Sequence, residues 1–160
     1  MRVGPTLERI LKDYPDDVRI AYKQHPLPMH ANAMIAAEAA MAAAAQGKFA
    51  EMHARLMAPD RTLSREKILD NAKQLGLDVE KFTKDLDSHA HKAAIDEMSA
   101  EAMRVGAGGT PASFVNGRFM SGAQPFDAFK KVIDDELMMK GIPIPAAAAT
   151  TTSALIPPKQ

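Results

Sequence analysis

A tight-turn signal near the C-terminus constrains the fold more than any other feature of this chain. Asn116-Gly117 stands between two short runs, 112–115 and 118–121, each of which contains a phenylalanine followed by a second apolar residue. Asn-Gly between strand-like runs predicts a two-residue β-hairpin, because both residues accept the positive φ of a type I′ turn. The fold must therefore contain an antiparallel strand pair late in the sequence.

The stretch before the hairpin, residues 31–106, has the periodicity of helices throughout. Ser64 and Asp78 stand where side-chain caps would start two of these helices, and each has an apolar pair placed as a hydrophobic staple. Gly76 stands where a C′ glycine would end the first of the two. A longer helix is expected to start near Ser88 and to stop at Gly106.

The flanking segments complete an α/β pattern. Apolar residues between Val3 and Tyr14 recur at helical spacing, and the alternating run 18–22 predicts a strand. Pro125 is placed to open a last helix, which Lys140-Gly141 closes. After it, residues 141–160 are rich in Pro, Ala and Thr without periodicity, so we expect a disordered tail behind one folded domain, 1–140.

Charge and hydropathy exclude several classes of partner. The 20 basic and 20 acidic residues balance, which gives no reason to expect nucleic acid as a partner. The longest apolar run, 31–45, is too short and too polar for a membrane span. Met1-Arg2-Val3 leads directly into a helical pattern, so we expect no signal peptide in this chain, and the sequence leaves its localisation open.

The chain contains no cysteine, which excludes disulfides, thiolate metal sites and cysteine nucleophiles. Four of its histidines form two close pairs, His25 with His30 and His89 with His91. Neither pair has the i, i+4 helical spacing with a nearby acid that is typical of zinc sites. We therefore expect no metal and no cofactor.

Three motifs resemble the DsbA-like branch of the thioredoxin superfamily. They are the segment 25–30 with its following alanine-rich helix, the segment 46–53, and the run from Gly109-Thr110-Pro111 through the hairpin to Phe126. The resemblance covers roughly 2–137 and implies a thioredoxin-like sheet with a large all-helical insertion at about 31–106. It also implies that the family's activity is thiol–disulfide exchange on protein thiols, mostly in the periplasm or cell envelope.

The chain departs from this family at its N-terminus, where Met1 stands in place of the end of the Cys-x-x-Cys motif. The interpretation is a DsbA-lineage domain without redox activity, either a truncated fragment or a degenerate member. In relatives the peptide bond of the loop that Thr110 and Pro111 match is cis, and its backbone pairs with an extended substrate. The first alternative is therefore a non-catalytic module that binds peptides through these two residues; the second is a glutathione-dependent isomerase.

The resemblance also implies that a central strand, between 18–22 and 112–115, is missing from this chain. Unpaired backbone groups in a buried sheet cost about 1–3 kcal/mol each, so the gap needs an explanation. Three remain open: the sequence is a truncated or misassigned start, a strand comes from another chain or another copy, or the sheet closes up with a different neighbour.

Overall fold

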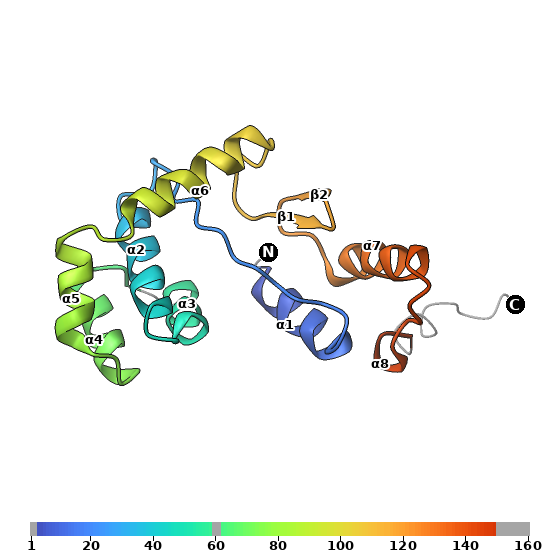
Figure 1. Cartoon of the computed structure of the whole chain (residues 1–160), viewed down its shortest axis with the longest axis horizontal. Helices are drawn as coiled ribbons and strands as arrows, with labels where there is room; N and C mark the ends of the chain where they lie inside the picture. The colour runs from blue at the N-terminus through green and yellow to red at the C-terminus, as the bar shows by residue number, and fades with distance from the viewer. Residues whose placement is uncertain (1–2, 59–61, 150–160) are drawn as a thin grey trace, which may run out of the picture. The chain divides into compact units, whose positions relative to one another are not determined.

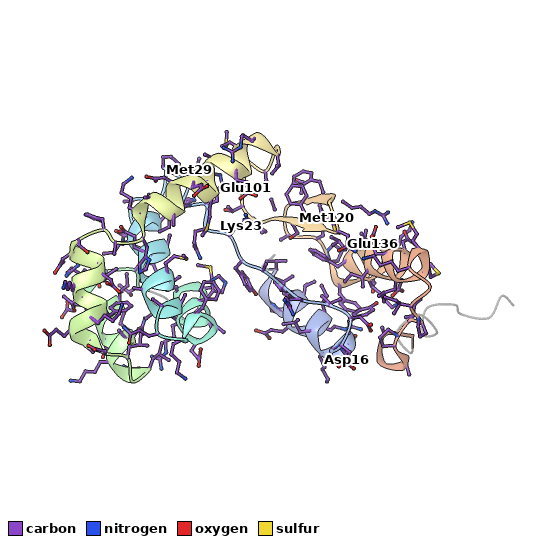
Figure 2. All side chains as sticks on the ribbon, viewed as in Figure 1. Asp16, Lys23, Met29, Glu101, Met120 and Glu136 are labelled. Atoms are coloured by element: carbon purple, nitrogen blue, oxygen red, sulfur yellow. The ribbon has the colours of Figure 1, made fainter. Side chains whose placement is uncertain are left out.

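The computed structural model describes residues 3–58 and 62–149, and these residues form two compact units (Figure 1). The helical unit comprises residues 23–108. The hairpin unit comprises the described residues of 1–22 and 109–160. Each unit has a hydrophobic cluster of its own. The predicted large helical insertion thus corresponds to a separately packed body.

Five helices make up the helical unit: α2 (Ala33–Ala44), α3 (Phe49–Met57), α4 (Arg65–Gln74), α5 (Val79–Asp87) and α6 (Lys92–Arg104). Helix α2 is the centre of the unit and packs against each of the other four helices. Its buried side chains are nearly all alanine, which lets neighbouring helix backbones approach closely. Larger side chains from the neighbouring helices, among them Met52, Ile68 and Phe82, fill the space around it.

The helix-start signals predicted for α4 and α5 are confirmed. The Ser64 hydroxyl accepts a hydrogen bond from the backbone N–H of Lys67 at 3.2 Å, and an Asp78 carboxylate oxygen accepts one from Lys81 N–H at 2.9 Å. Gly76 follows α4 with a φ of +70°. The helix expected near Ser88 instead begins at Lys92, because Ser88 terminates α5 and His89 turns the chain with a φ of +52°.

The hairpin unit contains α1 (Gly4–Asp13), β1 (Ala112–Val115), β2 (Arg118–Ser121), α7 (Phe126–Met139) and the short α8 (Ala146–Ala149). Helices α1 and α7 pack together and supply the cluster of Ile10, Tyr14, Phe126, Phe129, Ile133 and Leu137. Val18, Val115 and Met120 pack against the same cluster. The helix pair and the hairpin therefore share one core.

The hairpin has the predicted strands and turn. Strands β1 and β2 are antiparallel, with Val115 opposite Arg118 and Ala112 opposite Ser121. The two turn residues take positive φ, +48° at Asn116 and +89° at Gly117, as a type I′ turn requires. The pair makes up the whole sheet in the described part of the chain.

The strand predicted at 18–22 is not formed, and that prediction was wrong. The segment follows α1 as an extended stretch of chain that pairs with no strand (Figure 1). Val18 lies against the α1–α7 cluster, but within residues 3–58 and 62–149 nothing is hydrogen-bonded alongside the segment as a second strand. Alternation makes a segment suitable for a sheet, but only a hydrogen-bonded neighbour makes it a strand. Among the residues that the structure describes, no other strand takes the place of 18–22 beside the hairpin.

The segment after Gly141 is described as far as Ala149. Gly141 ends α7 with a φ of +68°, and α8 follows where the sequence pattern predicted no helix. Ile144 and the fully buried Ala148 pack against the α1–α7 cluster. The rest of the predicted disordered tail, 150–160, lies outside the described residues.

Candidate functional site

The loop that the sequence singled out leads directly into β1. Thr110 is exposed, Pro111 is half-buried, and the peptide bond between them is cis. The Pro111 carbonyl accepts a hydrogen bond from Gly122 N–H at 3.0 Å, just beyond the end of β2. The ladder thus begins one residue before β1, which ties the loop to the hairpin.

The hydrogen bond at Pro111 also fixes which backbone groups of β1 point away from β2. In an antiparallel pair, hydrogen-bonded and non-hydrogen-bonded residue pairs alternate. Because Pro111 and Gly122 are bonded, Ser113 and Val115 follow as bonded positions. The N–H and C=O groups of Ala112 and Phe114 then point to the opposite edge, where the described residues supply no further strand.

One face of the hairpin is apolar and open to solvent. Phe114 and Phe119 lie directly opposite each other, their ring centroids are 5.1 Å apart, and the residues are 44% and 47% exposed. Ala112 and Ser121 form the next pair on this face, so it carries no charge. On the opposite face, Val115 and Met120 pack against the α1–α7 cluster. This aromatic pair was not predicted from the sequence, although side chains that alternate along the two predicted strands place both rings on one face.

Helix α1 begins at Gly4, shortly after Met1, the position where the resemblance to the DsbA-like family implies the end of a Cys-x-x-Cys motif. Its N-cap, Val3, offers no side-chain hydrogen bond, and a proline occupies the first turn. Free N–H groups and the helix dipole at such an end lower the pKa of a thiol placed there. The sequence contains no cysteine, so the N–H groups at the start of α1 have no thiolate to stabilise.

Hydrogen bonds of charged and titratable side chains connect α1 to α7 in the hairpin unit. The buried Tyr14 hydroxyl donates to an Asp134 carboxylate oxygen at 2.6 Å, and Lys130 donates to the same carboxylate. Burial, together with that negative charge, raises the pKa of the Tyr14 phenol far above its ordinary value. Burial and the nearby Glu8 carboxylate raise the pKa of Tyr22 as well. Through Asp134, the Tyr14 hydroxyl joins the end of α1 to α7.

Among the described residues, no group of three or more His, Asp or Glu side chains lies close enough together to hold a metal ion. His89 pairs with the buried Glu38 at 2.9 Å, and His91 lies 3.8 Å from Asp85. Both ring nitrogens of His25 are buried without a hydrogen-bond partner among these residues. None of the helices described is long and apolar enough to cross a membrane.

These features define a thioredoxin-like protein. The structure is similar to a thioredoxin-like oxidoreductase from Silicibacter pomeroyi DSS-3, with a TM-score of 0.69 and 26% identity over 85% of this chain and 82% of that one. The profile of the family described as "DSBA-like thioredoxin domain" matches residues 2–134. The chain belongs to this DsbA-like family.

Curated relatives are much longer proteins. The chain is 40% identical over 110 residues to the Na(+)/H(+) antiporter NhaA of Herminiimonas arsenicoxydans, a match that covers 69% of this chain and 17% of that protein. It is 37% identical over 132 residues to Na(+)/H(+) antiporter NhaA 3 of Salinispora tropica, covering 81% of this chain and 20% of that protein. The chain therefore spans about a fifth of the length of these relatives.

Proposed function

We propose that this chain is a DsbA-lineage domain that does not itself catalyse thiol–disulfide exchange. One observation carries the proposal: none of the 160 residues is a cysteine. Exchange proceeds by attack of a thiolate on a disulfide sulfur, and a second thiol then resolves the mixed disulfide. Neither sulfur is present, and a hydroxyl without an adjacent base does not replace a thiolate as the nucleophile.

The test is an insulin-reduction assay run beside a thiol-oxidation assay on a reduced two-cysteine peptide. A DsbA-type enzyme with an intact Cys-x-x-Cys serves as the positive control. The expected rates for this chain equal the rates without protein, because no group on it can form the mixed disulfide. Turnover that scales with the concentration of the cysteine-free chain would refute the proposal.

A second candidate function is the binding of extended peptides at the Thr110–Pro111 loop. It is supported by the exposure of Thr110 and by the outward-pointing backbone groups of Ala112, the first residue of β1. A peptide laid along this corner could accept and donate main-chain hydrogen bonds, as in other cases of strand addition. No side-chain chemistry is needed, so this role is compatible with the absence of cysteine.

Peptide binding at the loop is tested by NMR titration of the full chain with an unstructured peptide that contains serine in place of cysteine. The Thr110 and Ala112 amide signals are expected to shift in proportion to occupancy, while amides of α5 in the helical unit stay unmoved. Unchanged Thr110 and Ala112 signals at millimolar peptide would exclude this role. That result would leave the proposed lack of redox activity untouched, because the two are measured separately.

The similarity to the named antiporters supports the assignment to the DsbA lineage. It does not support a role of this chain in ion transport. The match to the Salinispora tropica protein spans 132 residues, or 81% of this chain, and the DsbA-like profile spans residues 2–134, so the two must overlap over most of their length. The similarity therefore concerns a DsbA-like domain, which makes up about a fifth of each relative. We infer that partners of this domain are extended polypeptide segments, including protein segments that share a chain with it.

A further inference from the structure

We propose that the pair of His89 and Glu38 is a proton-sensitive clasp. It holds the corner between α5 and α6 against α2 while the His89 ring is charged, and it loosens when the ring is neutral. The clasp lies within the helical unit and depends neither on the Thr110–Pro111 loop nor on the lack of redox activity. Three observations carry it: the burial of Glu38, the backbone conformation of His89, and the place of His89 at the end of α5.

Glu38 is a buried acid in a helix that is otherwise almost entirely apolar. It lies in the middle of α2, with two alanines on each side of it in sequence, and only 4% of its side chain is exposed. Burying a carboxylate is costly unless a donor or a positive charge meets it. The Nδ1 atom of His89 lies 2.9 Å from Glu38 Oε1, and no other side chain in the described part of the chain pairs with this carboxylate. The state of His89 therefore decides how well the Glu38 charge is compensated.

His89 has a backbone conformation that histidine seldom adopts, with a φ of +52°. Its N–H donates to the Leu86 carbonyl at 3.2 Å, and the next N–H, of Ala90, donates to the Asp85 carbonyl at 2.9 Å. These two hydrogen bonds end α5 in a Schellman motif, whose left-handed position is usually filled by glycine because a side chain is unfavourable there. The contact with Glu38 thus offsets a backbone cost that glycine would avoid. It also holds α6, since the His89 carbonyl accepts from the N–H of Lys92, the first residue of that helix, at 3.0 Å.

The place of His89 at the end of α5 makes the clasp sensitive to protons. The last carbonyls of a helix carry partial negative charge, which favours a cation beside them. An ionised carboxylate can only accept, so Glu38 requires Nδ1 of His89 to be the donor, whether or not the ring is charged. Imidazoles change charge between about pH 5 and 8. The neutral ring still donates to Glu38 but no longer balances its negative charge, so loss of the proton weakens the clasp without removing it.

Other charged groups near the corner have to be separated from the pair in a test. Ion pairs join Lys81 to Asp85 at 2.7 Å, Arg65 of α4 to Asp87 at 2.5 Å, and Lys92 to Asp96 at 2.6 Å, and Lys84 is a further cation on α5. Between about pH 5 and 8, the other side chains of this unit that change charge are histidines. They are His25, His30, His53 of α3, and His91, whose Nε2 lies 3.8 Å from Asp85.

The test is amide hydrogen exchange of the full chain at about pH 5 and pH 8, with each rate divided by the intrinsic rate at that pH. The reporter is the Ala90 N–H, whose hydrogen bond closes the corner, and the reference is the N–H of the buried Ile68 in α4. We expect the protection of Ala90 to fall by about fivefold from the lower to the higher pH, because the corner opens more easily once the ring is neutral. Ile68 reports opening of the whole unit, including any effect of His53, so a fall that Ile68 does not share is local.

Three variants assign the effect to the pair. Glu38→Gln keeps the size and hydrogen-bonding capacity of the side chain but removes its charge, and His89→Gly accepts the positive φ while removing the ring. Each should abolish the local fall in Ala90 protection. His91→Asn is the matched control, since it removes a neighbouring imidazole that pairs with Asp85 instead of Glu38, and it should retain the fall. Nitrogen NMR of the neutral His89 ring should also find the proton on Nδ1 in the unmodified chain, a preference that Glu38→Gln should weaken.

Several results would overturn the proposal. Equal protection of Ala90 at both pH values in the unmodified chain would show that the proton on His89 does not control the corner. A fall that persists in both Glu38→Gln and His89→Gly would assign the pH effect to another group, and its loss in His91→Asn would assign it to that histidine. None of these results bears on the proposed lack of redox activity, which is measured separately.

Discussion

The hydrogen bond between Tyr14 and Asp134 gives the most direct test of how the hairpin unit is held together. Tyr14 ends α1 and is fully buried, and Asp134 lies on α7, 120 positions away in sequence. The two residues thereby join the first and the last long helix of this unit, and Lys130 donates to the same carboxylate. The substitution Tyr14→Phe removes only the hydroxyl and keeps the buried ring.

The expected loss follows from the type of hydrogen bond removed. A hydrogen bond to a charged group contributes about 1.5–3 kcal/mol. In the variant the Asp134 carboxylate still pairs with Lys130, and its side chain is 14% exposed, so its negative charge is not left buried without a partner. We therefore expect Tyr14→Phe to lower the free energy of unfolding by about 1–2 kcal/mol. In a chain of this length that corresponds to a fall in Tm of roughly 2–8 °C.

The same group predicts a dependence on alkaline pH. The pKa of Tyr14 is raised in the folded state, so the folded state holds the phenolic proton more tightly than the unfolded state. The stability that it contributes is complete below the unfolded pKa of about 10 and is lost as the pH rises above that value toward the folded pKa. Tyr14→Phe should therefore flatten the fall in stability above pH 10.

The assay is urea unfolding followed by circular dichroism at neutral pH and at several pH values above 9. Tyr22 also has a raised pKa, so Tyr22→Phe is measured in parallel to define its share of the alkaline slope. A Tyr14→Phe chain as stable as the unmodified chain at pH 7, with an unchanged alkaline slope, would refute the reasoning. It would mean that the Tyr14 hydroxyl does not link α1 to α7 in solution.

Three further predictions concern other parts of the chain. Asp78→Ala removes the cap of α5 and should cost about 1 kcal/mol in urea unfolding, whereas Asp78→Asn should retain most of the stability. Phe82→Ala should cost about 3–5 kcal/mol, because the ring is fully buried at the centre of the helical unit; a smaller loss in calorimetry would argue against that core. Burial lowers the pKa of His53, so the unfolded state binds its proton more readily. Stability should then fall as the pH drops below about 6.5, and His53→Gln should reduce this fall if histidine burial is its cause.

Local chemistry made most elements predictable from the sequence. Asn116-Gly117 specified the hairpin and its turn type, since few residues accept two consecutive positive φ values. Ser64, Asp78 and Gly76 located helix ends because caps satisfy backbone groups within a few residues. The Thr110–Pro111 loop and its position before β1 were likewise evident from the sequence, although its role as a binding site remains a prediction.

Features that depend on a distant partner were not predictable in the same way. The alternation at 18–22 predicted a strand, but strand formation requires a hydrogen-bonded neighbour that the described residues do not provide. Helix α6 begins at Lys92, later than predicted, because His89 turns the chain with a positive φ. The His89 ring also pairs with Glu38 of α2, which lies 51 positions earlier in the sequence. Contacts between residues so far apart produce no pattern in the nearby sequence from which they could be predicted.

The family, the hairpin, the helix caps and the absence of thiol chemistry follow from the residues alone, because each depends on residue identity or on contacts within a few positions. The folded structure shows, beyond this, that residues 23–108 form a body with its own core and that the Tyr14 hydroxyl donates to Asp134. It also decided that β1 keeps an open edge beside the exposed rings of Phe114 and Phe119. The physical reason is that burial and strand pairing are properties of what surrounds a residue, and surroundings are assembled from segments far apart along the chain.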